Sequence, residues 1–151
     1  MKPTRLSTLL GLAAVAGVVL YALTSSFYGD LPPLPLYGPV FLVLLAAAEG
    51  YTASTTAARL AGRPRTEPIH PITVARIAAL AKATSPVAAL FAGGYAGFLA
   101  YVVQVEGPHA AADVRACAVG LAASLALVGA ALWMERVCRV KPPKPNVDET
   151  D

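Results

Sequence analysis

Residues 6–29 read LSTLLGLAAVAGVVLYALTSSFYG, a stretch of 24 residues without Asp, Glu, Lys or Arg. As an α-helix this stretch would be roughly 36 Å long, because each residue adds about 1.5 Å. The hydrocarbon core of a bilayer is ~30 Å thick. The stretch therefore predicts a membrane-spanning helix.

Three further stretches repeat this pattern downstream. Residues 83–105 and 116–134 carry no charged side chain, and residues 39–58 carry Glu49 before ending at Arg59. Of the 151 residues, 56% are hydrophobic and 14% are charged, whereas a soluble domain carries about a quarter charged residues. We therefore predict an all-α integral membrane bundle of four transmembrane helices. The spans lie at about residues 6–28, 39–58, 80–104 and 115–135, in one domain of residues 1–140.

Positive charges predict the orientation of the bundle. Of the 12 Lys and Arg residues, all but Arg115 lie before the first span, between the second and third, or after the fourth. Short loops rich in Lys and Arg stay in the cytoplasm. We therefore expect a multi-pass protein of the inner (plasma) membrane with both termini cytoplasmic. Because membrane orientation explains the positive charge, we expect no nucleic acid as a partner.

The first span has an alternative interpretation as a cleaved signal peptide, since Lys2 and Arg5 precede it. Its apolar run is longer than the roughly 7–15 residues of a typical signal peptide. The stretch Ala22-Leu23-Thr24 is also a poor match to the usual cleavage pattern. We therefore expect the span to be retained; cleavage would leave three spans with the same cytoplasmic loop and tail.

Prolines mark the connections between the spans. Residues 30–36 and 61–71 are rich in proline and predict a stiff outer turn and a helix-free inner loop. Further along, Pro86 either bends one long third helix or marks a helix start near Thr84. We prefer the bent long helix. Residues 141–151 lack apolar side chains that would offset the entropy of ordering, so they predict a disordered cytoplasmic tail.

Glu49 is an acidic residue near the middle of a predicted span. Counted from Arg59, it lies roughly 15 Å inside the membrane, where a bare carboxylate costs about 3 kcal/mol. Thr52 and Thr56 follow at helical spacing, so the three form an intramembrane polar stripe that should face the other helices. The stripe has two interpretations, a structural acid that fixes helix packing or a proton or ion site. We prefer packing, because no second acid lies at membrane depth.

Small residues at four-residue spacing predict close helix packing. Gly93 and Gly97 form such a face on the third span, and the first and fourth spans repeat the spacing. Packing within one chain accounts for these faces, and a homo-oligomer is the alternative.

Cysteine and histidine residues form no catalytic or metal-binding pattern. Cys117 and Cys138 lie roughly 31 Å apart on one predicted helix, too far for a disulfide. Arginines beside Cys138 would favour a reactive thiol, although an inert thiol is the ordinary case. His109, Asp113 and Glu106 lack a firm metal-ligand spacing. We therefore expect no metal, no cofactor and no enzymatic activity.

Four local sequences occur together in this chain. They are MKPTR at residues 1–5, LPPLP at 31–35, AR at 75–76 with ALAKA at 79–83, and LWMERVCR at 132–139. With four spans in this order, the chain resembles, along nearly its whole length, an uncharacterised family of small actinobacterial membrane proteins, a domain of unknown function. Genes of that family often lie near folate-biosynthesis genes, which implies a loose metabolic or envelope association. The resemblance carries no catalytic residue over to this chain.

Within this resemblance, the recurrent positions form a cytoplasmic charge cluster. Its members are Arg76, Lys82, Glu135, Arg136 and Arg139. One interpretation is a docking site for a soluble protein or an anionic lipid, with Glu135 pairing to Arg76 or Lys82. The other, which we prefer at this point, is ordinary positive-inside anchoring.

These features predict a non-enzymatic accessory or interaction subunit of a membrane complex. Its partners would be the lipid bilayer and another membrane or cytoplasmic protein. The alternative is a small transport component in which Glu49 exchanges a proton.

Overall fold

The computed structural model describes residues 5–28, 34–61, 71–105 and 110–138, and these ranges contain four α-helices and no strand. Each helix is long and apolar enough to cross a membrane, which confirms the predicted all-α architecture. The helices are α1 (Leu6–Phe27), α2 (Tyr37–Leu60), α3 (Pro71–Val102) and α4 (Ala110–Val137). The tail predicted at 141–151 lies outside the described residues, as do Glu106, His109 and Arg139.

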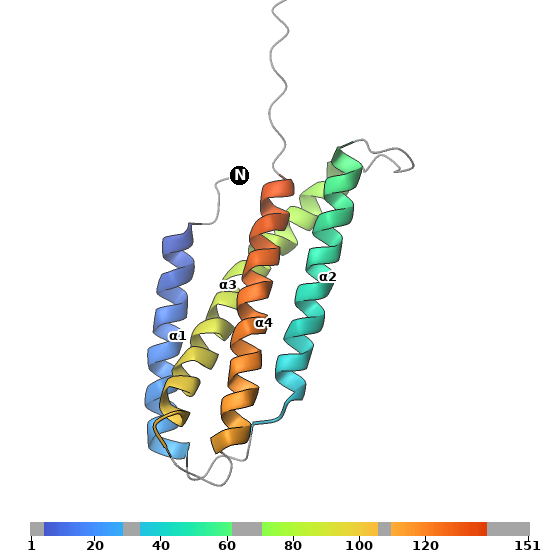
Figure 1. Cartoon of the computed structure of the whole chain (residues 1–151). Helices are drawn as coiled ribbons and strands as arrows, with labels where there is room; N and C mark the ends of the chain where they lie inside the picture. Colours follow the sequence, from blue (N-terminus) through green and yellow to red (C-terminus); the bar gives the residue numbers. More distant parts are fainter. Residues whose placement is uncertain (1–4, 29–33, 62–70, 106–109, 139–151) are drawn as a thin grey trace, which may run out of the picture.

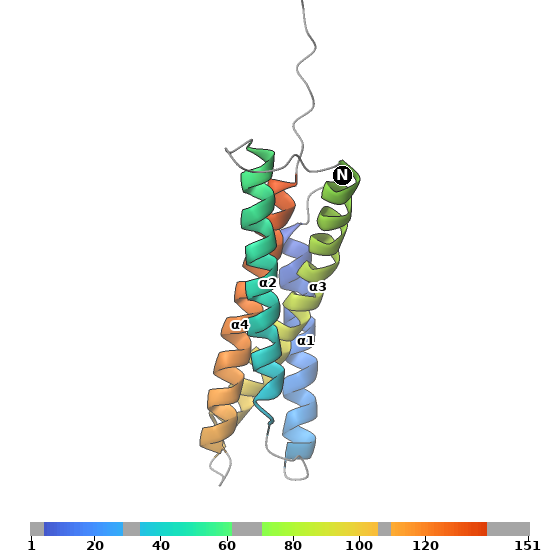
Figure 2. The ribbon, with the colours of Figure 1, turned by 90° about the vertical axis from the view of Figure 1, so that its right-hand side faces the viewer.

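The helices pack side by side in the order α1, α3, α4, α2 (Figures 1 and 2). α3 contacts α1 and α4, and α4 contacts α2, whereas α1 and α2 share no extensive contact. The start of α1, the end of α2, the start of α3 and the end of α4 lie at one end of the bundle (Figure 1). We call this the basic end, because the exposed side chains of Arg5, Arg59, Arg76 and Arg136 lie there.

The outer surface of the bundle is apolar, as contact with lipid requires. Leu10 of α1, Phe41 of α2 and Leu125 of α4 are each more than half exposed. The buried hydroxyl groups of Thr24, Ser85 and Ser124 donate to carbonyl oxygens of their own helices; Ser124 donates to Gly120 at 2.7 Å. Such internal hydrogen bonds suit a helix in hydrocarbon, where water is not available as a partner.

α1 lies directly against the backbone of α3. A Cβ atom added to Gly93 would collide with the carbonyl group of Ala13, and one added to Gly97 would collide with that of Gly17. Both contacting pairs are 80 residues apart in the sequence, so α1 and α3 run parallel. The glycines therefore permit a backbone contact that any larger side chain would block.

α3 and α4 meet around a tyrosine ring. The ring of Tyr95 covers Gly120 so closely that an added Cβ atom would overlap it. The Tyr95 hydroxyl lies 3.4 Å from the position of a Cβ atom at Gly38. One side chain of α3 thereby reaches both α4 and the start of α2.

α3 is a continuous helix of 32 residues with Pro86 inside it. It crosses the bundle obliquely from the basic end to the opposite end (Figure 1). The structure thus has the long third helix that the sequence predicts, and no new helix begins near Thr84.

Candidate functional site

Glu49 is a buried acid between α2 and α3. Its side chain is 5% exposed, and its carboxyl group makes a hydrogen bond with the Thr84 hydroxyl of α3. The Oε2 atom of Glu49 has no hydrogen-bond partner in the described part of the chain. Sequence reasoning missed Thr84, because no local pattern indicates which residue of another helix faces Glu49.

The register of the helices fixes the level of this acid relative to α1. Ala13 lies against Gly93 and Gly17 against Gly97, so by the same offset Arg5, which precedes α1, lies about level with Ser85. Thr84, the partner of Glu49, is the adjacent residue of α3. Glu49 is therefore about level with the residue that precedes α1, because the end of α2 projects past the level at which α1 begins.

The predicted polar stripe is only partly assembled. Glu49 and Thr56 are both buried on the inner face of α2. Thr52 is only half-buried, and its hydroxyl donates to the carbonyl oxygen of Ala48 in its own helix at 2.8 Å. The structure therefore brings Glu49 together with Thr84 and leaves Thr52 to one side.

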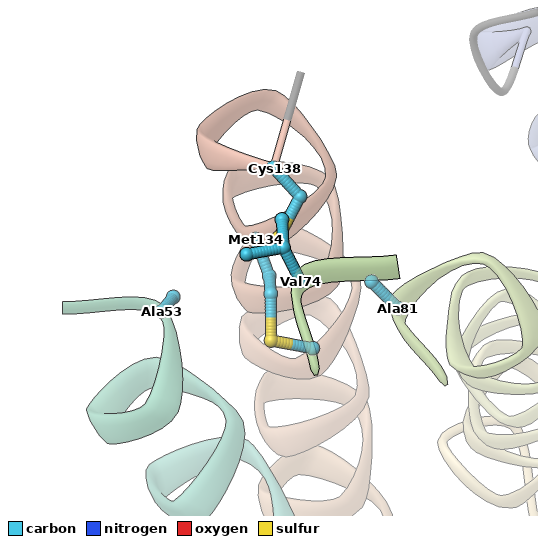
Figure 3. Packing of buried hydrophobic residues seen from close by; sticks show 5 residues of the cluster. All are labelled: Ala53, Val74, Ala81, Met134 and Cys138. Carbon is cyan, nitrogen blue, oxygen red and sulfur yellow. The ribbon is translucent and has the colours of Figure 1, made fainter. Parts of the chain in front are cut away.

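An apolar cluster lies between the level of Glu49 and the basic end, and Figure 3 shows its buried side chains. It joins α2, α3 and α4, and the ends of the helices bring its side chains together. Its buried members are Ala53, Val74, Ala81, Met134 and Cys138.

A second apolar cluster lies on the other side of Glu49, toward the middle of the bundle. It again joins α2, α3 and α4. Its buried members are Leu42, Ala88, Ala123 and Leu127. Glu49 is thus enclosed by apolar packing in both directions along the bundle.

Two members of the predicted charge cluster, Arg76 and Lys82, lie on different sides of α3. Arg76, Lys82 and Arg136 are exposed, and Glu135 is half-buried. Arg76 and Lys82 are six residues apart on α3, which places them on different sides of that helix at 100° per residue. The helix geometry therefore separates these two charges.

Two apolar hollows lie along α3, one on the side of α1 and one on the side of α2. The first, of about 650 Å³, lies between α1 and α3. The second, of about 410 Å³, lies between α2 and α3 and extends from Gly38 to Ala83 and Thr84. Both are bordered by the same three side chains of α3, Val87, Phe91 and Tyr95.

Asp113 ties three segments together at the end opposite the basic end. It lies in the first turn of α4 and is 3% exposed. Its two carboxylate oxygens accept hydrogen bonds from the Tyr28 hydroxyl at 3.0 Å and from the Leu34 backbone N–H at 2.9 Å. Burial and the hydrogen bond to Asp113 raise the pKa of Tyr28, which keeps its hydroxyl in the donating form. Asp113 therefore connects the start of α4 to Tyr28, at the end of α1, and to Leu34, which precedes α2. The sequence did not predict this role.

Both cysteines are buried and free. Burial raises the pKa of the Cys138 thiol, so its place next to arginine in the sequence does not make it reactive. Among the described residues, no group of three His, Cys, Asp or Glu side chains is placed to hold a metal ion.

The fold defines a class, multi-pass helical membrane proteins, through its four apolar helices. A family model described as "protein of unknown function (DUF3180)" matches residues 9–142. The chain belongs to this family, as the resemblance indicates. Comparison with curated proteins and with solved structures gave no match.

Proposed function

We propose that this protein is a non-enzymatic accessory subunit of a plasma-membrane complex, with both termini in the cytoplasm. The observation that carries the proposal is the enclosure of Glu49 between two apolar clusters. A transport site requires a polar route to water on each side. An enclosed acid instead fixes the register of α2 against α3, so that the outer surface of the bundle is presented in one arrangement.

The hydrogen bonds around Glu49 support a packing role for the neutral acid. The Thr84 hydroxyl donates to the carbonyl oxygen of Leu80 at 3.1 Å. A hydroxyl has one hydrogen to donate, so Thr84 accepts from Glu49 when it donates to Leu80. A protonated carboxyl group satisfies this arrangement without placing a bare charge in an apolar environment. An amide at position 49 would satisfy it equally well.

The test is affinity purification of the full chain from its native membrane after crosslinking, with the partners identified by mass spectrometry. We expect a stoichiometric partner that is retained by Glu49→Gln and lost with Glu49→Leu, because leucine removes the hydrogen bond that links α2 to Thr84 of α3. A wild-type protein that purifies without any partner would contradict the proposal.

The unpartnered Oε2 atom favours a second candidate, a small proton-coupled transport component. In that case Glu49→Gln would abolish function and leave assembly intact, because an amide cannot release a proton at neutral pH. Retained function in Glu49→Gln excludes this candidate.

A further inference from the structure

We propose that the groove between α2 and α3 binds an anionic phospholipid of the leaflet at the basic end. One acyl chain of the lipid would occupy the second hollow, and Arg59 and Arg76 would hold its phosphate group. This site is independent of the accessory role proposed above.

The hollow fits a hydrocarbon chain. Its walls are apolar side chains of α2 and α3, and Leu127 of α4 lies behind them. Its polar side chains are Thr84, at the end of the hollow nearer the basic end, and Tyr95, at the other end. From Ala83 to Tyr95 the hollow follows α3 for roughly 18 Å, slightly more than the ~15 Å thickness of one leaflet's hydrocarbon. A chain entering from the basic end would therefore remain in contact with α3 throughout its leaflet.

The register of α2 against α3 places the two arginines opposite each other. Gly38 of α2 faces Tyr95 of α3, and Glu49 of α2 faces Thr84 of α3. In each of these pairs the two residue numbers add to 133. By the same register Arg59 of α2 faces residue 74 of α3, and Arg76 lies only two residues further along. Both side chains are exposed, so two cations flank the groove at about the same level.

Each arginine also continues a wall of the hollow. On α3, Arg76 lies seven and eleven residues before Ala83 and Val87, which places all three on one side of the helix. On α2, Arg59 lies eighteen residues after Phe41, which is five helical turns. The groove that begins between apolar walls therefore ends between two guanidinium groups.

Both arginines lie beyond the level at which α1 begins, on the side where lipid head groups would lie. Arg76 lies eight residues beyond Thr84, roughly 12 Å along the helix, and Thr84 is about level with the start of α1. Side chains of a helix lean toward its N-terminus, so the Arg59 side chain leans from the end of α2 back toward the groove. The Arg76 side chain, near the start of α3, leans the other way and has to turn back to reach a phosphate group there. Arginine binds phosphate oxygens in a bidentate manner, and anionic lipids enrich the cytoplasmic leaflet that the basic end is expected to face.

The experiment titrates the purified full chain in mild detergent with phosphatidylglycerol or phosphatidylcholine and counts bound lipids by native mass spectrometry. We expect the wild-type chain to retain phosphatidylglycerol more strongly than phosphatidylcholine. The double variant Arg59→Gln/Arg76→Gln should weaken phosphatidylglycerol binding by about tenfold or more and leave phosphatidylcholine binding unchanged.

Two further variants separate this site from general attraction to the basic end. Arg136→Gln removes an exposed arginine of α4 at the same end and should leave phosphatidylglycerol binding unchanged. Ala83→Phe fills the hollow without changing charge and should weaken binding of phosphatidylglycerol. The proposal is overturned if Arg136→Gln weakens binding as much as the double variant, if Ala83→Phe has no effect, or if the spectra show a protein dimer in place of the lipid.

Discussion

Asp113 is a single side chain that connects segments far apart in the sequence at one end of the bundle. It lies 85 residues from Tyr28 and 79 from Leu34 in the sequence, yet it holds both. The sequence suggests only a weak metal ligand at this position, because nothing local to Asp113 indicates a tyrosine hydroxyl and a backbone N–H as its partners. Glu49 is a similar case: its burial could be predicted from its place in a span, but its hydrogen-bond partner Thr84 could not.

Removing the Asp113 carboxylate should destabilise the fold. In Asp113→Ala the Leu34 N–H and the Tyr28 hydroxyl both lose their acceptor, and such a loss costs about 1–3 kcal/mol for a buried group. Thermal unfolding of the purified chain in detergent measures the change. Asp113→Asn is the matched control, since its amide group offers one acceptor and one donor to the same two partners and should unfold closer to wild type.

Cys138 should react slowly with maleimides at neutral pH. Its pKa is raised by burial, so less thiolate is present at pH 7 than for an ordinary thiol, and the rate should increase as the pH rises. The rate is measured on a Cys117→Ser chain in permeabilised membranes. A cysteine placed at the exposed position in Arg136→Cys, with Cys138 replaced by serine, provides the reference rate; equal rates at pH 7 would contradict the burial of Cys138.

At the scale of elements, the close helix approach at Gly93 and Gly97 could be predicted from the sequence, although the sequence did not indicate that α1 is the partner. Four-residue spacing of Gly93 and Gly97 predicts a close helix approach, and the structure places both against α1. The number of helices followed from uncharged runs. The level of Glu49 did not, because charge positions show where a helix can leave the membrane and not how far its end projects beyond its neighbours.

Adding one methyl group at this contact should separate α1 from α3. In Gly93→Ala and Gly97→Ala the new Cβ atom would collide with a backbone carbonyl of α1, and overpacking of this kind costs about 1–3 kcal/mol. Thermal unfolding in detergent again provides the measurement. Gly129→Ala is the control, because nothing lies within 4 Å of its added Cβ atom; a comparable loss of stability there would show that glycine itself, and not the contact, matters.

At the scale of the whole molecule, the distribution of arginines follows the arrangement of the helices. The four helices place their arginine-rich ends on one side of the bundle (Figure 1), and Arg115 is exposed on α4 near the other end. The positive-inside rule then predicts that the basic end faces the cytoplasm. The sequence predicts that the arginine-rich helix ends lie together, because each of the four helices crosses the bundle once; the side of the membrane that they face stays a prediction.

Cysteine labelling of intact cells tests the orientation. With a membrane-impermeant maleimide, Arg115→Cys should react in intact cells, whereas Arg136→Cys should react only after the membrane is permeabilised. Both natural cysteines are buried, so the wild-type chain serves as the background. The reverse pattern would place the basic end outside the cell.

The spatial order α1, α3, α4, α2 also has a consequence for synthesis. A ribosome delivers α1 and α2 first, yet these two helices share no extensive contact in the finished bundle. α1 therefore gains its packing partner only when α3 has been made, and α2 only when α4 has been made. The newly made N-terminal half therefore lacks every extensive helix contact of the finished bundle, and we expect a chain interrupted after α2 to leave two separate helices exposed to other proteins and to membrane proteases.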